Sequence, residues 1–193
     1  MLQYLLTPSE EYSRAELAQM AIEGGCKWIV LPTDGLDDAA VREECSEIVP
    51  LCREAEVILT LTDRPELARE LGLHGVYLTG GCGITPAKVR EELGAEAIIG
   101  VEVSSAASIK PLEAMDIDYA VLNAELPTDK SIEIIIDSRE AGAIIPIVMQ
   151  GAQTPAEGAE MRALGATGLL VGNGISNAAD PEKAVREFLT AGE

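Results

Sequence analysis

Short apolar runs alternate along this chain with longer segments in which apolar residues recur at helical spacing. The clearest example begins with the apolar run 145–149 and ends with the apolar run 168–171. Between them, Thr154 and Glu157 have the spacing of a capping box, and Gly165 is suited to the left-handed end of a helix. This order predicts a βα unit with parallel strands, in which the turns after both strands lie at one end of the sheet.

The same order of elements recurs along the whole chain. Strands are predicted at residues 3–7, 27–31, 57–61, 75–78, 97–101, 119–122, 145–149 and 168–171. Helices are predicted to start near Ser13, Asp37, Asp63, Thr85, either Ser104 or Ser105, Ser131, Thr154 and Asp180. About eight units of about 24 residues predict an α/β fold, a minimal (β/α)8 TIM barrel that residues 1–193 form as a single domain. An open doubly wound sheet is the alternative.

The composition predicts which residue types fill the core and which classes of partner the protein does not bind. Hydrophobic residues make up 47% of the chain and aromatic residues only 3%, so we expect a core of Leu, Ile, Val and Ala. The formal net charge is −19, whereas nucleic acids and anionic membranes bind clustered Lys and Arg. Residues 1–8 lack the basic flank of a signal peptide, and no apolar run reaches membrane-spanning length. We therefore expect a cytoplasmic protein with no nucleic-acid and no membrane partner.

The cysteines and the single histidine show no pattern of metal or redox chemistry. The cysteines have neither CxxC spacing nor histidine partners, which predicts reduced and mostly packed thiols at Cys26, Cys45, Cys52 and Cys82. His74 lies between two glycines at the start of a predicted strand, and this position indicates a structural role.

In a barrel, functional side chains lie at the carboxyl ends of the strands. The polar residues predicted there are Asp34, Asp63, Arg64, Glu102, Ser104, Asn123, Glu125, Asp129, Lys130, Gln150 and Asn173. Asp63 could bind Mg²⁺ or cap its helix, and Lys130 could bind an anionic substrate or remain solvated at a helix start. Both alternatives stay open on spacing alone.

Glycine turns follow the last two predicted strands. One turn contains Gly151 and Ala152, and the other contains Gly172, Asn173 and Gly174. Either these turns only reverse the chain, or their backbone N–H groups bind a phosphate. Because the turns after strands seven and eight are the usual phosphate site of this fold, we favour phosphate binding.

Several segments, in order and spacing, resemble the superfamily of thiamine phosphate synthases and thiazole tautomerases. The matching segments are YLLTP at 4–8, TDRPELA at 62–68, LHGVYL at 73–78, IIGVEVSS at 98–105, DYAVLNAELPTDK at 118–130, IPIVMQGA at 145–152 and GLLVGNGI at 168–175. The resemblance implies a TIM barrel that joins hydroxymethylpyrimidine pyrophosphate to thiazole phosphate. It implies Mg²⁺ at Asp63, a pyrophosphate contact at Lys130, and the thiazole phosphate on the two glycine turns. We also expect a phosphorylated small molecule and a second copy of this chain, in a homo-oligomer, as partners.

The chain also differs from the superfamily pattern at charged positions. After the second strand the superfamily has the pattern Gln-x-Arg-x-Lys, whereas residues 31–35 of this chain are LPTDG. The position of the superfamily's second metal-binding Asp is occupied here by Cys82 or a neighbouring glycine. The Ser of Ser-x-His after the fifth strand is Glu102, which joins Lys130 as a candidate catalytic residue. Each lost charge-stabilising group typically costs about 3–4 kcal/mol of transition-state stabilisation. A catalytically degenerate relative that binds a phosphorylated metabolite is therefore the alternative.

Overall fold

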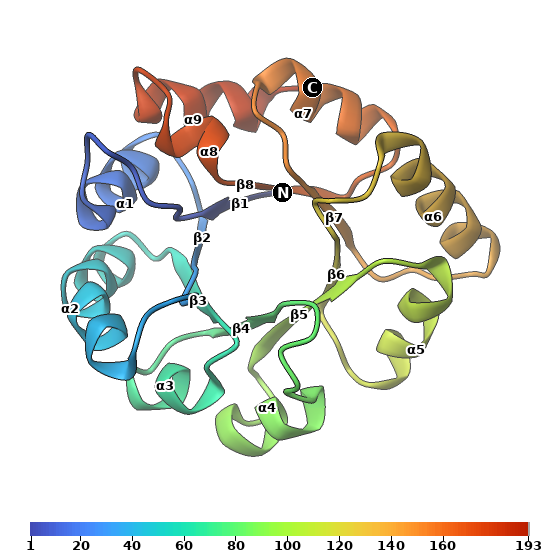
Figure 1. Ribbon diagram of the computed structural model, residues 1–193, viewed down its shortest axis with the longest axis horizontal. Coiled ribbons are helices and arrows are strands. Elements are labelled where there is room, and N and C mark those ends of the chain that lie inside the picture. Colours follow the sequence, from blue (N-terminus) through green and yellow to red (C-terminus); the bar gives the residue numbers. More distant parts are fainter. Residues whose placement is uncertain (193) are drawn as a thin grey trace.

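Eight parallel strands form a closed barrel inside a ring of helices in the computed structural model, which describes residues 1–192 (Figure 1). The strands are β1 (Leu2–Leu5), β2 (Trp28–Leu31), β3 (Ile58–Thr62), β4 (Gly75–Leu78), β5 (Ile98–Val103), β6 (Tyr119–Leu122), β7 (Ile147–Gln150) and β8 (Gly168–Val171). The helices are α1 (Arg14–Glu23), α2 (Asp38–Glu54), α3 (Pro65–Glu70), α4 (Pro86–Leu93), the 3₁₀ turn η1 (Ala106–Ser108), α5 (Ile109–Ala114), α6 (Thr128–Glu140), α7 (Pro155–Ala163), α8 (Asn173–Ser176) and α9 (Pro181–Thr190). The predicted (β/α)8 TIM barrel is confirmed.

Pairing between the first and last strands closes the sheet. Each strand pairs in parallel with the next strand along the chain, and β1 pairs with β8 with Gln3 opposite Leu170. An open doubly wound sheet is therefore excluded. Closure brings all eight strand ends into one mouth, so residues far apart in the sequence become neighbours there.

The barrel interior contains aromatic as well as aliphatic side chains. The Trp28 and Tyr119 rings meet edge to face, with ring centroids 5.2 Å apart. The Tyr119 ring lies directly over Gly100, because a Cβ placed at Gly100 would come within 2.1 Å of it. Tyr77, Val121 and other inward residues complete this inner cluster. The expectation of a purely aliphatic core is thus wrong for the interior, where large rings fill the space between strands.

The layer between the strands and the helices has the aliphatic composition that the sequence predicts. On α2 four residues at helical spacing are all buried, namely Val41, Cys45, Ile48 and Cys52. The cysteines are all free thiols, as predicted. His74 accepts a hydrogen bond at Nδ1 from the backbone N–H of Leu59 (3.1 Å), which is the structural role expected of it.

Several helix starts follow their sequence signatures. The capping boxes at the starts of α1 and α7 are both formed, by Ser13 with Glu16 and by Thr154 with Glu157. Asp37, Thr85 and Asp180 accept hydrogen bonds from the first turns of α2, α4 and α9. In these cases a side-chain hydrogen bond to the first turn marks where the helix begins.

Other helix starts differ from the prediction. The α3 helix begins at Pro65 after Arg64, with no side-chain cap, so Asp63 does not cap it. Ser105 precedes η1, but its hydroxyl bonds the Ser108 hydroxyl (2.8 Å) instead of a backbone N–H. The α6 helix begins at Thr128 and not near Ser131, because no capping side chain marks its start.

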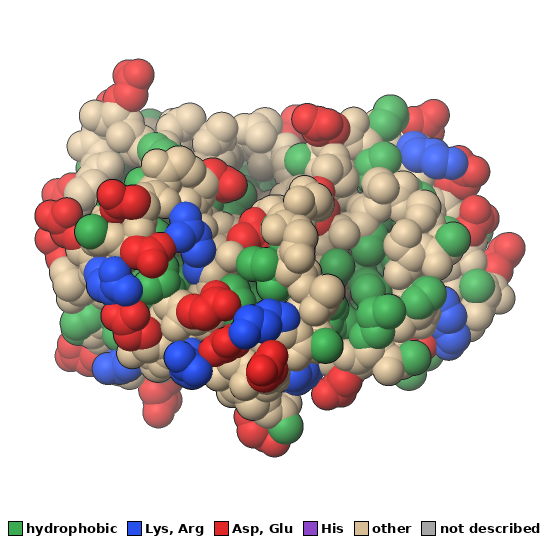
Figure 2. Space-filling view, turned by 60° about the horizontal axis from the view of Figure 1, so that its bottom comes forward, with side chains coloured by type: hydrophobic (Ala, Val, Ile, Leu, Met, Phe, Trp, Pro, Cys, Tyr) green, Lys and Arg blue, Asp and Glu red, His purple; other side chains and the backbone are tan. Residues whose placement is uncertain are grey.

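Charged side chains lie mainly on the helical exterior, where acids and bases are interspersed (Figure 2). Ion pairs link neighbouring helices, as between Arg42 and Glu70 (2.7 Å) and between Arg69 and Glu92 (2.8 Å). In residues 1–192, no helix has the length and apolar character needed to cross a membrane.

The loop between α6 and β7 is fastened to α5 through Glu113. This carboxylate accepts hydrogen bonds from the backbone N–H groups of Ile144 (2.5 Å) and Ile145 (2.9 Å) and from Lys110 Nζ (2.8 Å). The Lys110 ammonium, together with these N–H groups, lowers the pKa of Glu113 from 4.5 to about 2. The ionised carboxylate therefore fixes the chain just before β7.

We expect Glu113→Gln to lower the melting temperature at neutral pH by a few degrees. Because the folded-state pKa is depressed, the carboxylate's contribution is fully present above pH 4.5 and is lost as the pH falls toward 2. Thermal unfolding of both proteins between pH 7 and pH 3 tests this, with Glu140→Gln on exposed α6 as the control. A difference between variant and wild type that is the same at pH 7 and pH 3 would contradict the assignment.

Candidate functional site

Polar side chains from β3 to β6 meet at the carboxyl ends of the strands. Glu102 is on β5 at an inward position, since Ile98 and Gly100 on the same strand also face the interior. It accepts hydrogen bonds from the Tyr77 hydroxyl (2.9 Å) and from Asn123 Nδ2 (2.6 Å). Burial, and to a lesser extent the charge of Glu102, raise the pKa of Tyr77. The phenol therefore stays protonated and can donate a hydrogen bond.

Asp63 lies at the end of β3 in a left-handed backbone conformation, with φ of 52°. Its carboxylate accepts a hydrogen bond from the backbone N–H of Thr79 (2.8 Å) and another from the Thr79 hydroxyl. Burial and the nearby Asp63 raise the pKa of Cys82. Asp63 thus joins the β3 and β4 turns instead of capping a helix, which excludes the cap interpretation.

The residues around Asp63 do not form a complete metal site by themselves. Within residues 1–192, no group of three or more His, Cys, Asp and Glu side chains is arranged to hold a metal ion. Mg²⁺ often uses only one or two carboxylates together with substrate phosphates and water. Asp63 fits such a site as a single carboxylate ligand for a metal that arrives with a phosphorylated substrate.

The two predicted cations point to helix surfaces. Arg64 binds Asp38 (2.6 Å), the first residue of α2, and the carbonyl of Leu36 (2.8 Å), which lies just before that helix. Lys130 is exposed in the first turn of α6 and pairs with Glu133 (2.8 Å), whose hydrogen bond raises the pKa of Lys130. Both cations thus have carboxylate partners on helices, outside the group that surrounds Glu102.

The two glycine turns contact each other, as the sequence predicts for neighbouring strands. Gly151 has a φ of 102°, a conformation that favours glycine. Gly172 precedes α8, and the first-turn N–H groups of Asn173 and Gly174 have no acceptor within that helix. A Cβ at Gly174 would lie 2.8 Å from the carbonyl oxygen of Ala152, so the turns after β7 and β8 touch there.

The glycines in the second turn also have a packing role. A Cβ at Gly172 would lie 2.9 Å from Thr7 Cγ2, in the loop after β1. At the start of α7, the Glu157 carboxylate already accepts from the backbone N–H of Gln153 (2.6 Å). The start of α7 therefore already has an anionic partner in Glu157.

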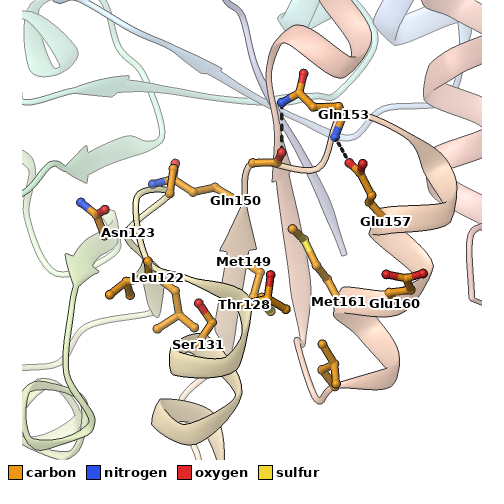
Figure 3. A pocket seen from close by; sticks show the side chains of 14 residues that line it. Leu122, Asn123, Thr128, Ser131, Met149, Gln150, Gln153, Glu157, Glu160 and Met161 are labelled. Carbon is orange, nitrogen blue, oxygen red and sulfur yellow. Dashed lines mark hydrogen bonds between the residues drawn. The ribbon is translucent and has the colours of Figure 1, made fainter.

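A groove of about 390 Å³ lies between α6 and α7 and reaches the Gly151 turn. Figure 3 shows Asn123 and Gln150, at the ends of β6 and β7, on one side of the groove, and Glu160 of α7 on the other. A second cavity of about 670 Å³ lies beside α8, where Asn173 and Ser176 face the loop after β1. The turn after β7 lines the first cavity and α8 lines the second, so both border the predicted phosphate position.

Sequence reasoning identified Glu102 and Asn123 as rim residues but missed Tyr77. The available signal was strand alternation, because Tyr77 is two residues after Gly75 on β4 and therefore faces inward with Glu102. Lys130 was expected in the mouth but lies on α6, because that helix begins earlier than predicted. The phosphate contacts at Gly151, Ala152, Gly172, Asn173 and Gly174 stay predictions, as does the metal role of Asp63.

The fold and the site together define a TIM-barrel protein whose polar groups gather at the carboxyl ends of the strands, where enzymes of this fold have their active sites. The sequence model of the family described as thiamine monophosphate synthase matches residues 3–175. This chain belongs to the thiamine monophosphate synthase family.

Named relatives agree with this family assignment. The chain is 30% identical to the thiamine-phosphate synthase of Bacteroides fragilis, with 97% of this chain and 98% of the relative aligned. It is 34% identical to the thiamine-phosphate synthase of Natronomonas pharaonis, over 98% of this chain and 94% of the relative. Among solved structures, thiamine phosphate pyrophosphorylase from Pyrococcus furiosus superposes with a TM-score of 0.82 at 22% identity, covering 98% and 94% of the two chains. This last match supports the fold.

Proposed function

We propose that the protein acts in thiamine biosynthesis in the cytoplasm and joins hydroxymethylpyrimidine pyrophosphate to thiazole phosphate. Family membership over nearly the whole chain supports the reaction type. The observation that carries the proposal is the contact between Gly174 and the backbone of Ala152, which places two glycine turns side by side. Their N–H groups would bind the phosphate of the thiazole substrate.

The reaction forms one bond and breaks another. The thiazole ring nitrogen attacks the methylene carbon of the pyrimidine, while the bond from that carbon to the pyrophosphate oxygen breaks and pyrophosphate leaves with the electron pair. The turns after β7 and β8 would orient the thiazole, and Asp63 would hold Mg²⁺ beside the pyrophosphate. When bound, Mg²⁺ supplies positive charge that stabilises the leaving group.

A second candidate function is binding of a phosphorylated metabolite without turnover. The observation that favours it is the placement of Arg64 and Lys130, which pair with Asp38 and Glu133 on helices. The turn after β2, residues 32–35, also carries no Lys or Arg. A pyrophosphate leaving group would then depend on Mg²⁺ and on backbone N–H groups alone.

Purified protein given both substrates at saturating concentration with Mg²⁺ should form thiamine phosphate above the uncatalysed rate. We expect chelation of the metal to abolish the product, and Asp63→Asn to lower kcat by about 10²–10³-fold, as for loss of one charge-stabilising group. Glu125→Gln, which removes a rim carboxylate elsewhere in the mouth, serves as the control. No product above background in wild-type protein would exclude the synthase reaction and leave the binding function.

The phosphate position is tested separately with Asn173→Asp, which adds a negative charge at the start of α8 without adding bulk. A charge pair about 4 Å apart near a protein surface repels by about 1–4 kcal/mol, so affinity for thiazole phosphate should fall about tenfold or more. Gln19→Glu, on the exposed face of α1, adds a negative charge away from the mouth and should bind nearly as wild type does. Calorimetric titration measures both, and equal affinities of Asn173→Asp and wild type would place the phosphate elsewhere.

A further inference from the structure

Glu102 is a partly buried carboxylate whose recorded hydrogen-bond donors are both neutral. Tyr77 and Asn123 each donate to one of its two oxygens. Ionised carboxylate oxygens can each accept more than one hydrogen bond, so acceptor capacity remains on both. In residues 1–192, no ion pair of Glu102 with Lys or Arg is recorded.

The surroundings hold this carboxylate in one position. A Cβ at Gly80 would lie 2.7 Å from Glu102 Oε1, so the side chain packs directly against the β4 turn. Tyr77 is only 2% exposed and is fixed by the interior packing, and Asn123 is fixed by accepting at Oδ1 from the backbone N–H of Glu125 (2.7 Å). Residues from β4, β5 and β6 thus orient Glu102 before any ligand binds, which lowers the cost of recognition.

The other charged groups described near Glu102, Asp63 and Glu125, are also carboxylates. Asp63 accepts its two recorded hydrogen bonds from Thr79, a neutral residue, and Glu125 lies exposed on the rim beside Asn123. An anionic group placed beside Glu102 would be repelled, whereas a cationic group would form a charge-assisted contact in a partly desolvated site. The positive part of a ligand is therefore favoured beside Glu102 on β5, whereas the placement of its phosphate at the β7 and β8 turns rests on the proposed function.

We propose that Glu102 is the specificity-determining residue for a positively charged nitrogen heterocycle, so that the barrel mouth prefers a ligand with a cationic ring at one end and a phosphate at the other. The phosphate end of this inference rests on the proposed function. The cationic end rests on the contacts and charge of Glu102. Thiamine phosphate has this charge arrangement, because its thiazolium ring carries a permanent positive charge.

A purely structural role for Glu102 makes a different prediction. If the carboxylate only braced Tyr77 and Asn123, Glu102→Gln would lower stability and weaken all ligands alike. If it recognises positive charge, the same substitution weakens cationic ligands selectively. Three probes separate these cases: thiamine has the cationic ring alone, thiazole phosphate has the phosphate alone, and thiamine phosphate has both.

We expect calorimetric titration of Glu102→Gln to show about tenfold weaker binding of thiamine and thiamine phosphate than wild type, with thiazole phosphate within about twofold. Glu125→Gln is the matched control, since it removes an exposed rim charge without touching Glu102, and it should change no affinity by more than about twofold. Unchanged binding of both cationic probes to Glu102→Gln would overturn the proposal, as would equal weakening of all three probes.

A second measurement uses the wild-type chain alone, in case Glu102→Gln does not fold. An analogue of thiamine whose thiazolium nitrogen is replaced by carbon has nearly the same shape and no ring charge. Wild type should bind thiamine about tenfold more tightly than this analogue. Equal affinities, or no binding of thiamine, would refute the role of Glu102. Because thiamine lacks phosphate, this result is independent of whether the turns after β7 and β8 bind phosphate.

Discussion

Pairing of β1 with β8 closes the sheet into a barrel and fixes where every strand ends. A closed barrel of eight strands has room inside only for side chains, and here the Tyr119 ring occupies the space that Gly100 leaves free. Closure also forces consecutive strand ends to lie next to each other. The glycine turns after β7 and β8 therefore touch, and Glu102 on β5 meets donors from β4 and β6.

The mouth has two parts that differ in the polar groups they offer a ligand. On the β7 and β8 side, the proposed phosphate contacts are backbone N–H groups at the start of α8, in a cavity that Glu10 and Glu11 also line. On the β3 to β6 side, Asp63 and Glu102 accept hydrogen bonds from neutral groups, while Arg64 and Lys130 pair with carboxylates on helices. A ligand with a phosphate at one end and positive charge at the other matches both parts. Pyrophosphate, with its high negative charge, matches the second part only with a metal ion.

The sequence predicted the architecture because its strongest signals are local. Capping boxes at Ser13 and Thr154, and apolar runs separated by helix-ending glycines, each depend on a few adjacent residues, and they were confirmed. Predictions failed where contacts between distant residues decide the outcome. Asp63 was a plausible cap by spacing, yet its carboxylate bonds Thr79, sixteen residues later. The partnership of Tyr77 with Glu102 likewise depends on strand register, which no short motif encodes.

A crystal structure of the protein with thiamine phosphate would show whether one ligand spans both parts of the mouth. We expect phosphate oxygens within hydrogen-bond distance of backbone N–H groups of Asn173 and Gly174, and a thiazolium ring that faces Glu102. A phosphate bound beside Asp63 or Lys130, with the ring away from Glu102, would contradict this expectation.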